Sequence, residues 1–181
     1  MLEIRWHGRG GQGAFTAARL LGAAALCDGQ FALAFPSFGP ERRGAPIQAF
    51  TRIDDRRIGD RSAIRACDFA VVLDETLVGP LVVEGIRSGG ALLVNSARST
   101  PEWAGMGVRV LSVDVNAIAR TILGRPIANT GMMGALVAAS GAVRLEAALH
   151  AIQSEMRAEL AEKNGEVLRR CFDLVAENPH A

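Results

Sequence analysis

The sequence is poor in the residues that hold redox centres and metal ions. Its three cysteines, Cys27, Cys67 and Cys171, lie far apart and form no C-x-x-C pair. No histidines or acidic residues cluster beside them, so we expect no iron–sulfur cluster and no zinc site held by this chain alone. Cys27 and Cys67 fall in apolar stretches, which predicts small buried side chains in a reducing compartment.

Common catalytic signatures are missing as well. The chain has no G-x-S-x-G nucleophile elbow, no H-E-x-x-H helix and no Walker A motif, and Lys163 is its only lysine. Of its three histidines, only His7 lies beside a glycine-rich turn. A hydrogen-bonded structural histidine is the simpler interpretation of His7, with a site residue as the alternative.

Long apolar runs and a charge bias are also absent. No run approaches the roughly 20 apolar residues of a membrane span, and no basic-hydrophobic leader is present, so we expect a cytoplasmic protein. A formal net charge of +1 argues against nucleic acid or an anionic membrane as partner. Because 49% of the residues are hydrophobic, the surplus apolar surface is most simply covered by a partner subunit.

The most distinctive stretch that is present opens the chain. Residues 2–7 form a short alternating apolar run, residues 8–13 are rich in glycine, and residues 14–27 form a helical run that is apolar on nearly all sides. This order is typical of the start of a βαβ unit. The glycines follow the G-x-G-x-x-G spacing, which allows a tight turn and close backbone approach to a ligand.

Two interpretations of this turn remain open. The free amides at the helix start would attract a nucleotide phosphate, or the glycines would serve only close packing of helix on strand. A dinucleotide site also needs an acidic residue after the second strand. The candidate, Asp28, comes before the run at 31–35 that we expect as that strand, so the sequence disfavours NAD.

A second distinctive stretch spans residues 36–46. Its three prolines and two glycines exclude a helix or a central strand, so it must be a loop of defined shape. Within it, Glu41, Arg42 and Arg43 are able to clamp a carboxylate or a phosphate. With the apolar Phe38 beside them, we interpret the loop as a docking element for a partner rather than as a solvated tip.

Strands that alternate with helices predict an α/β fold, a single Rossmann-like domain with a mainly parallel sheet flanked by helices. After the first strand we expect strands at 31–35, 47–53, 68–74, 91–96 and 108–113, the first of these inside the parallel part of the sheet. We expect a helix from the 68–74 strand to about residue 88, a short helix at 115–123 capped by Asp114, an apolar helix at 135–143 opened by residues 129–134, and surface helices from about 145 to 175.

Residues 4–13 and 35–46, taken together, resemble the gamma subunit of 2-oxoacid:acceptor oxidoreductases. Pyruvate:ferredoxin and 2-ketoisovalerate:ferredoxin oxidoreductases are familiar members of this family. The likeness continues through residues 68–76, 89–96 and 129–134, and so covers nearly the whole chain. It implies one gamma-type catalytic domain over residues 1–181, with a helical C-terminal tail from about 145.

The resemblance implies a reaction for the complete enzyme. Such enzymes oxidatively decarboxylate a 2-oxoacid (pyruvate, branched-chain or aryl) with coenzyme A, giving an acyl-CoA, carbon dioxide and reduced electron carriers. Thiamine diphosphate, magnesium and [4Fe-4S] clusters belong to the holoenzyme. The gamma subunit of this family holds none of them, and the absence here of a cysteine set and of a Gly-Asp-Gly motif for the magnesium diphosphate agrees.

By this resemblance the chain is mainly structural and inactive alone. Its partners would be the alpha, beta and delta-type subunits, thiamine-binding and ferredoxin-like, with no nucleic acid and no membrane. No catalytic residue and no metal ligand is expected in it. The residues that we expect to dock partners, or to border the active site or the coenzyme A path, are Gly8, Arg9, Gly10, Gly11, Gln12, Gly13, Phe38, Gly39, Glu41, Arg42, Arg43 and Gly44. Two alternatives remain: a free-standing mononucleotide- or flavin-binding module, and an assembly module without a ligand.

Overall fold

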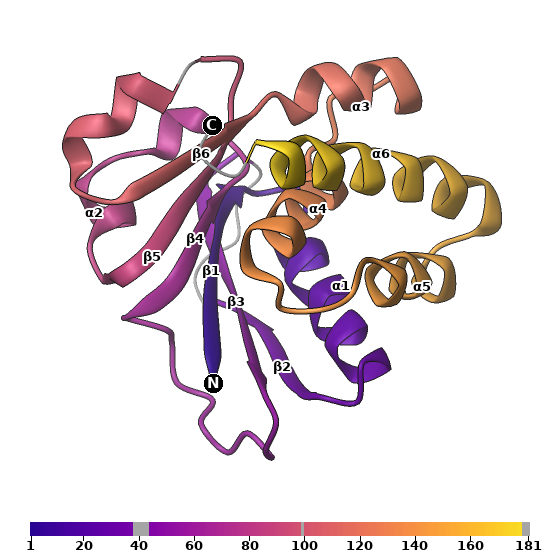
Figure 1. Cartoon of the computed structure of the whole chain (residues 1–181), viewed down its shortest axis with the longest axis horizontal. Coiled ribbons are helices and arrows are strands. Elements are labelled where there is room, and N and C mark those ends of the chain that lie inside the picture. Colours follow the sequence, from indigo (N-terminus) through magenta and orange to yellow (C-terminus); the bar gives the residue numbers. More distant parts are fainter. Residues whose placement is uncertain (38–43, 99, 179–181) are drawn as a thin grey trace.

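A computed structural model describes residues 1–37, 44–98 and 100–178 of the chain, and its centre is a mixed β-sheet (Figure 1). The strands are β1 (Leu2–Arg9), β2 (Phe31–Pro36), β3 (Pro46–Asp54), β4 (Cys67–Val72), β5 (Ile86–Asn95) and β6 (Arg109–Val113). Their order across the sheet is β2-β3-β1-β4-β5-β6. Strands β1, β4, β5 and β6 run parallel, whereas β3 pairs antiparallel with both β1 and β2. The prediction of an α/β fold with a mainly parallel sheet is confirmed.

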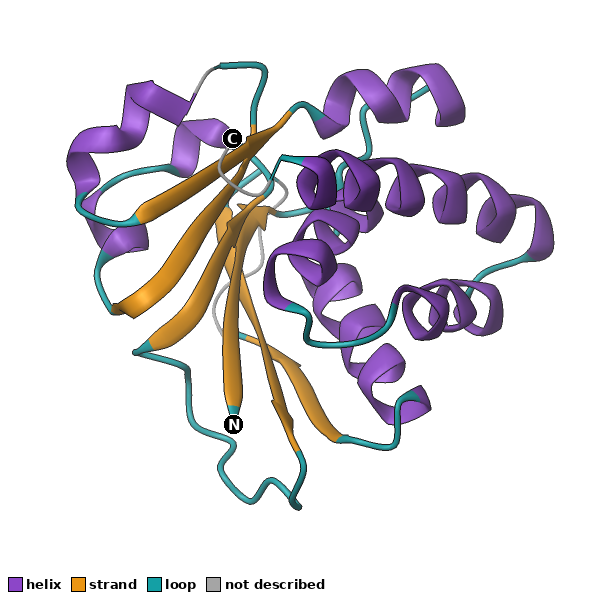
Figure 2. Ribbon diagram, in the orientation of Figure 1, coloured by secondary structure: helices purple, strands orange, loops and turns teal. Residues whose placement is uncertain are grey.

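The longer helices gather on one side of the sheet, as Figure 2 shows. They are α1 (Ala14–Cys27), α3 (Val115–Leu123), α4 (Asn129–Ser140), α5 (Leu145–Glu155) and α6 (Ala158–Glu177). Within the described residues, the other side carries only short elements: the 3₁₀ turns η1 (Glu75–Leu77) and η2 (Thr100–Met106), and the single-turn helix α2 (Pro80–Val83). No helix of the described segments is long and apolar enough to cross a membrane.

The core on the helical side is built by close backbone approach. Trp6 of β1 is fully buried, and its Nε1 donates to Oγ1 of Thr51, which in turn donates to the carbonyl of Ala18 in α1 at 3.0 Å. Gly134 lets the backbone of α4 pack directly on the backbone of α6, because a Cβ on Gly134 would lie 2.2 Å from the carbonyl oxygen of Leu168. These contacts fix α1 against the sheet and α4 against α6, and α1 and α4 begin next to each other at the carboxyl edge of the sheet.

Two expectations about the strands are wrong. The run at 31–35 was expected inside the parallel part of the sheet, yet β2 is an antiparallel edge strand that pairs only with β3. The next strand, β3, lies between β2 and β1, so the chain returns to the centre of the sheet. The helix expected up to about residue 88 is replaced by η1 and α2, and β5 begins at Ile86. Gly90 lies inside β5, where a Cβ would come 2.5 Å from the carbonyl oxygen of Asp68.

Three further expectations need correction. Cys27, predicted as a buried side chain, is exposed at the end of α1, while Cys67 is buried as predicted. Residues 129–134 belong to α4 itself, which ends at Ser140 rather than near residue 143. The C-terminal helices are only partly on the surface, because α6 buries Val167, Leu168 and Cys171. The predicted helix at 115–123 is confirmed, with the Asp114 side chain accepting from the Ala117 amide at 2.9 Å.

Candidate functional site

A cavity of about 520 Å³ lies at the carboxyl edge of the parallel strands. Its wall comes from the segments that follow β1, β4, β5 and β6 and from the residues that precede α4. The lining residues are Gly11, Gln12, Leu73, Asp74, Glu75, Thr76, Asn95, Ser96, Ala97, Asp114, Asn116, Arg120, Pro126, Ile127 and Ala128. Open α/β sheets bind their ligands at this edge, and a cavity of this size accommodates a nucleotide-sized group.

The first wall is the glycine-rich turn, which Asp74 holds in place. The Oδ2 atom of Asp74 accepts hydrogen bonds from Nε of Arg9 and Nε2 of Gln12, both at 3.0 Å. The Oδ1 atom of the same carboxylate accepts from the hydroxyl of Thr76 at 2.6 Å. Arg9 also donates to the Thr76 hydroxyl at 2.8 Å and to the carbonyl of Gly44 at 3.2 Å. One carboxylate therefore ties the end of β1 to the segment after β4, and Arg9 extends the link to Gly44.

The charge of Asp74 is stabilised by these contacts. Partial burial alone would raise its pKa, but hydrogen bonds from Thr76 and Gln12, together with the charge of Arg9, outweigh burial and lower the pKa below its usual value. Asp74 is thus ionised at neutral pH. Since its oxygens are already occupied by protein donors, we assign it to positioning the turn rather than to proton transfer.

The opposite wall is fixed by Asn95 at the end of β5. Its Nδ2 donates to the Leu73 carbonyl at 2.9 Å, and its Oδ1 accepts from the backbone N–H of Asn116 at 3.3 Å. One amide thereby joins the ends of β4 and β5 to the start of α3. Next to it, the Ser96 hydroxyl donates to Glu75, whose second oxygen lies 3.5 Å from Nε of Arg98. The carboxylate of Glu75 is paired, while the side chains of Asn116 and Arg120 form no hydrogen bond or ion pair with the described residues.

Three helices begin around the cavity. The N-cap residues are Asp114 for α3, Ala128 for α4 and Gly13 for α1. Gly13 has a φ of +81° and provides no side-chain cap. The starts of α1 and α4 touch, because a Cβ on Gly13 would lie 2.6 Å from Nδ2 of Asn129. The first amides of α3 are already bound, because Asn95 accepts from the Asn116 amide and Asp114 from the Ala117 amide. Helix α1 has no side-chain cap, so its free amides and the partial positive charge of its N-terminus favour an anionic group such as a phosphate.

His7 lies outside the cavity. It is 3% exposed, and burial, aided by the positive charge of Arg5, lowers its pKa to about 4, so the ring is neutral at pH 7. Its Nε2 has no hydrogen-bond partner among the described residues. A structural role agrees with this burial, although the expected hydrogen bond is not made by Nε2.

The side chains do not fit a metal or a cluster. The described part of the chain has no group of three histidine, cysteine or acidic side chains able to hold a metal ion. Cys67 and Cys171 are buried in different core clusters, and burial raises the pKa of both thiols, that of Cys171 to about 12. Cluster ligands must be thiolates gathered at one point, so these cysteines offer no such site.

The structure places only part of the predicted site. Arg9, Gln12 and Gly44 meet in one network, and Gly10 joins it by a 3.1 Å hydrogen bond from the Gly44 amide. Gly8 lies within β1, and Gly11 lines the cavity. Phe38, Gly39, Glu41, Arg42 and Arg43 lie outside the described residues, so their role stays a prediction.

The far side of the cavity was not predicted from the sequence. Asp74, Asn95, Asn116 and Arg120 were not predicted as site residues. A signal did exist, because Asp74 and Asn95 are polar residues at the ends of apolar runs read as strands. Polar residues at the ends of parallel strands meet at one edge of the sheet, and this rule would have found them.

Known proteins support one family for the whole chain. A model described as "Pyruvate ferredoxin/flavodoxin oxidoreductase" matches residues 3–174. Pyruvate synthase subunit PorC from Methanocaldococcus jannaschii is 46% identical over 174 residues, 96% of each chain. The pyruvate/ketoisovalerate oxidoreductases common subunit gamma from Thermococcus litoralis is 43% identical over 178 residues, again 96% of each chain.

The fold supports the same family. The crystal structure of pyruvate oxidoreductase subunit PORC from Thermotoga maritima superposes with a TM-score of 0.85 at 41% identity, covering 95% of each chain. A match of this extent includes the sheet, the glycine-rich turn and the helical tail together. The chain therefore belongs to the pyruvate ferredoxin/flavodoxin oxidoreductase family, in which it is a gamma-type subunit of an oxidoreductase.

Proposed function

We propose that this chain is the gamma subunit of an enzyme that oxidatively decarboxylates pyruvate or a branched-chain 2-oxoacid with coenzyme A. The observation that carries the proposal is similarity over 96% of the chain to subunits named for pyruvate and ketoisovalerate oxidoreductases. Thiamine diphosphate and the iron–sulfur clusters then belong to the other subunits, since the donor set described above fits neither a cluster nor a metal. The chain contributes scaffold and binding surface, and no redox step.

The cavity at the carboxyl edge is the part of this chain that would border the coenzyme A path. Coenzyme A carries phosphates, and the uncapped N-terminus of α1 adjoins the cavity through Gly11 and Gln12. Arg120 of α3 lines the cavity and is exposed, so its guanidinium is able to bind a phosphate through two parallel hydrogen bonds. The network around Asp74 keeps the glycine-rich turn in a fixed shape, so less entropy is lost on binding.

The same edge also suits a partner subunit. Phe15 in the first turn of α1 is 37% exposed and Ile127 at the cavity is 39% exposed, although both are large apolar side chains. The docking loop predicted at 36–46 joins this edge through Gly44, because the Arg9 guanidinium donates to its carbonyl. We assign this rim to the thiamine-binding subunits, so that the cavity would open toward the reacting centre.

The test is kinetic and uses the complex co-expressed from all its subunits. Arg120→Ala should raise the KM for coenzyme A about tenfold, the loss of about 1.4 kcal/mol expected for one charge-assisted contact, and leave the KM for the 2-oxoacid unchanged. Thr121→Ala is the matched control, because this neighbouring residue is exposed and lies outside the cavity wall. Equal coenzyme A KM values for Arg120→Ala and the wild type would refute the role of the cavity.

A second measurement separates the gamma subunit from the alternative, a free-standing mononucleotide- or flavin-binding module. The purified chain alone should bind neither flavin nor mononucleotide and should show no oxidoreductase activity. A flavin spectrum, or a nucleotide mass bound to the chain alone, would instead support a free-standing binding module. Assays of the complete complex over pyruvate, branched-chain and aryl 2-oxoacids then name the substrate.

A further inference from the structure

A loop at the other end of the sheet is not explained by the cavity. Residues 55–66 join β3 to β4 without helix or strand, at the end of the sheet where β1 and β2 begin (bottom of Figure 1). We call this segment the arginine loop. Connections of about 12 or more residues without secondary structure are uncommon within compact domains, and when they are ordered they are usually functional.

Buried Arg52 fixes the middle of the arginine loop. Its side chain is 2% exposed, and its NH1 donates to the carbonyls of Asp60 at 2.9 Å and Ser62 at 2.8 Å. Its NH2 lies 3.2 Å from the Asp60 carboxylate, and its Nε donates to Glu3 at 2.7 Å. The guanidinium therefore holds two loop carbonyls and one loop carboxylate in place.

Arg5 fixes the end of the loop in the same way. It is 6% exposed, and its NH1 donates to the carbonyl of Arg65 at 3.2 Å while its NH2 donates to the carbonyls of Val82 and Glu84. A buried guanidinium loses its hydration, and well-packed apolar residues in its place are often as stable or more so. Stability alone thus does not account for two buried arginines. A loop held in one conformation before it meets a partner does account for them.

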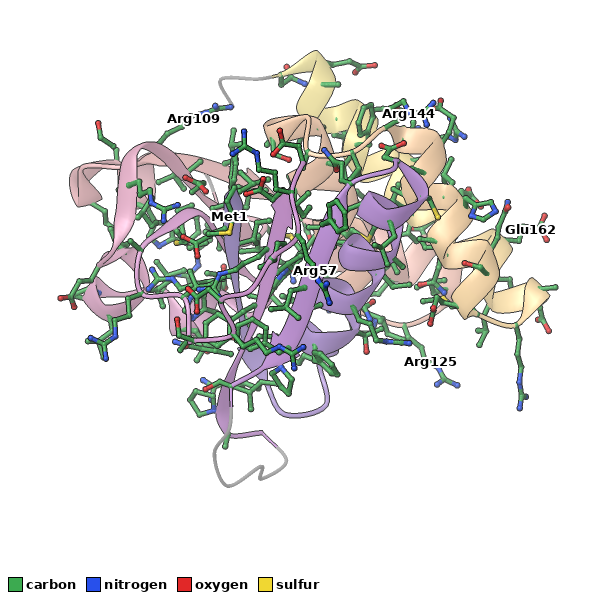
Figure 3. All side chains as sticks on the ribbon, turned by 90° about the horizontal axis from the view of Figure 1, so that it is seen from below. Met1, Arg57, Arg109, Arg125, Arg144 and Glu162 are labelled. Atoms are coloured by element: carbon green, nitrogen blue, oxygen red, sulfur yellow. The ribbon has the colours of Figure 1, made fainter. Side chains whose placement is uncertain are left out.

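The outward side of the arginine loop is positive. Asp60 pairs with Arg52, and Asp54, just before the loop, pairs with the Met1 amino group at 3.1 Å, so the exposed arginines of the loop outnumber its acidic side chains. Asp55 is the other acidic residue of the loop, and its carboxylate lies 3.9 Å from Nε of Arg56. The exposed arginines are Arg56, Arg57, Arg61 and Arg65. Neither Arg57 nor Arg61 has a side-chain hydrogen bond or ion pair within the described segments. Figure 3 is viewed from this end and labels Arg57 and Met1.

Exposed apolar side chains flank these charges. Phe31, the cross-strand neighbour of Asp54, is 46% exposed, and Met1 is 60% exposed. Arginine together with aromatic residues and methionine is typical of protein interfaces. The arginines are spread over residues 56–65, which fits an extended partner surface better than a pocket for one small anion.

We propose that the arginine loop docks a carboxylate-rich surface of another subunit in the assembled enzyme, an inference that rests on the multisubunit assembly proposed above. Guanidinium groups bind carboxylates through two parallel hydrogen bonds, and a positive patch speeds encounter with a negative one. Because the charges lie at the surface, this docking weakens as the ionic strength rises.

Zero-length cross-linking tests the contact directly. Carbodiimide joins amines to carboxylates but leaves arginine unreacted, and Lys163 is the only native lysine of the chain. The variants R57K and R61K keep the charge and each introduce one amine. In the purified complex at 50 mM salt, we expect cross-links from positions 57 and 61 to Asp or Glu of another subunit, and at least threefold fewer at 500 mM salt.

The control is R157K, because Arg157 is exposed at the start of α6, outside the arginine loop. Loop cross-links no more frequent than those of R157K, or confined to acids of the same chain, would overturn the proposal. Cross-links only to a second copy of this chain would also overturn it and would indicate self-association.

Charge reversal measures what the docking contributes. The double variant R57E/R61E should weaken subunit association at least tenfold at 50 mM salt and much less at 500 mM, with an unchanged melting temperature for the chain. Equal association at low salt would refute the docking role. Failure of the wild-type chain to enter any complex would instead refute the proposed function, so the two failures are distinguishable.

Discussion

Replacing Gly13 by alanine tests how tightly the start of α1 packs against the start of α4. Gly13 has a φ of +81°, a left-handed conformation that costs an L-residue about 1 to 2 kcal/mol. A Cβ there would also lie 2.6 Å from Nδ2 and 3.3 Å from Cγ of Asn129, whose side chain is 8% exposed. Overpacking at a buried contact costs about 1 to 3 kcal/mol. We therefore expect Gly13→Ala to lower the free energy of unfolding by about 3 kcal/mol.

Gly11 provides the matched control on the same turn. Its φ is +95°, but a Cβ there would have no atom within 4 Å, so Gly11→Ala should show only the conformational cost of about 1 to 2 kcal/mol. Urea unfolding followed by circular dichroism measures both variants. In an Asn129→Ala background the excess cost at Gly13 should disappear, as a double-mutant cycle would reveal.

Equal losses of stability in the two glycine variants would refute a clash between residue 13 and Asn129. The Asn129 side chain would then rotate away without cost, although its Oδ1 accepts from the Thr130 amide at 2.8 Å. An excess that persists in the Asn129→Ala background would also refute this clash. In that case the clash would lie elsewhere in the turn.

Three further predictions concern stability. Burial lowers the pKa of His7 from 6.5 to about 4, so between these pH values the unfolded chain binds a proton that the folded chain does not. The free energy of unfolding should therefore be highest above pH 6.5 and fall by up to about 3 kcal/mol toward pH 4. Urea unfolding at several pH values should show a shallower fall for His7→Gln, while His150→Gln, at an exposed position, should match the wild type; equal slopes for all three would contradict this. Asp74→Asn should lose about 2 kcal/mol in the same assay, because one oxygen that accepts charge-assisted hydrogen bonds becomes a donor; wild-type stability would show that the turn holds itself. Gly134→Ala should lose more than about 3 kcal/mol by colliding with the α6 backbone, whereas Gly165→Ala should gain up to about 1 kcal/mol from helix propensity, and a reversed order would refute the tight crossing of α4 and α6.

Local patterns in the sequence predicted most of the fold. The apolar run at 14–27, the alternation at 47–53 and the Asp114 cap each gave an element within about two residues of its position. The failures have a shared cause. Neither the antiparallel pairing of β2 nor the early start of β5 is encoded in local hydrophobicity, because both depend on which strand lies alongside.

The candidate site was predicted on one side only. Glycine spacing pointed to the turn, and the structure joins Arg9 and Gln12 of that turn to Asp74. The partners 62 and 65 residues away in sequence were out of reach of motif reasoning, since only the sheet order places β4 beside β1. The same limit applies to the arginine loop, because the pairing of Arg52 with Asp60 that holds it is visible only in the fold.

The central place of β1 has a consequence for how the chain folds during synthesis. This strand leaves the ribosome before the other strands of the sheet, yet its neighbours are β3 and β4, and β4 begins only at Cys67. The hairpin of β2 and β3 is able to close on β1 early, while the second edge of β1 stays open until β4 emerges. An open apolar strand edge is prone to wrong pairing, and contacts so distant in sequence form slowly. The nascent chain therefore passes through a stage in which its most buried strand is its most vulnerable one, and chaperone binding at that stage would protect it.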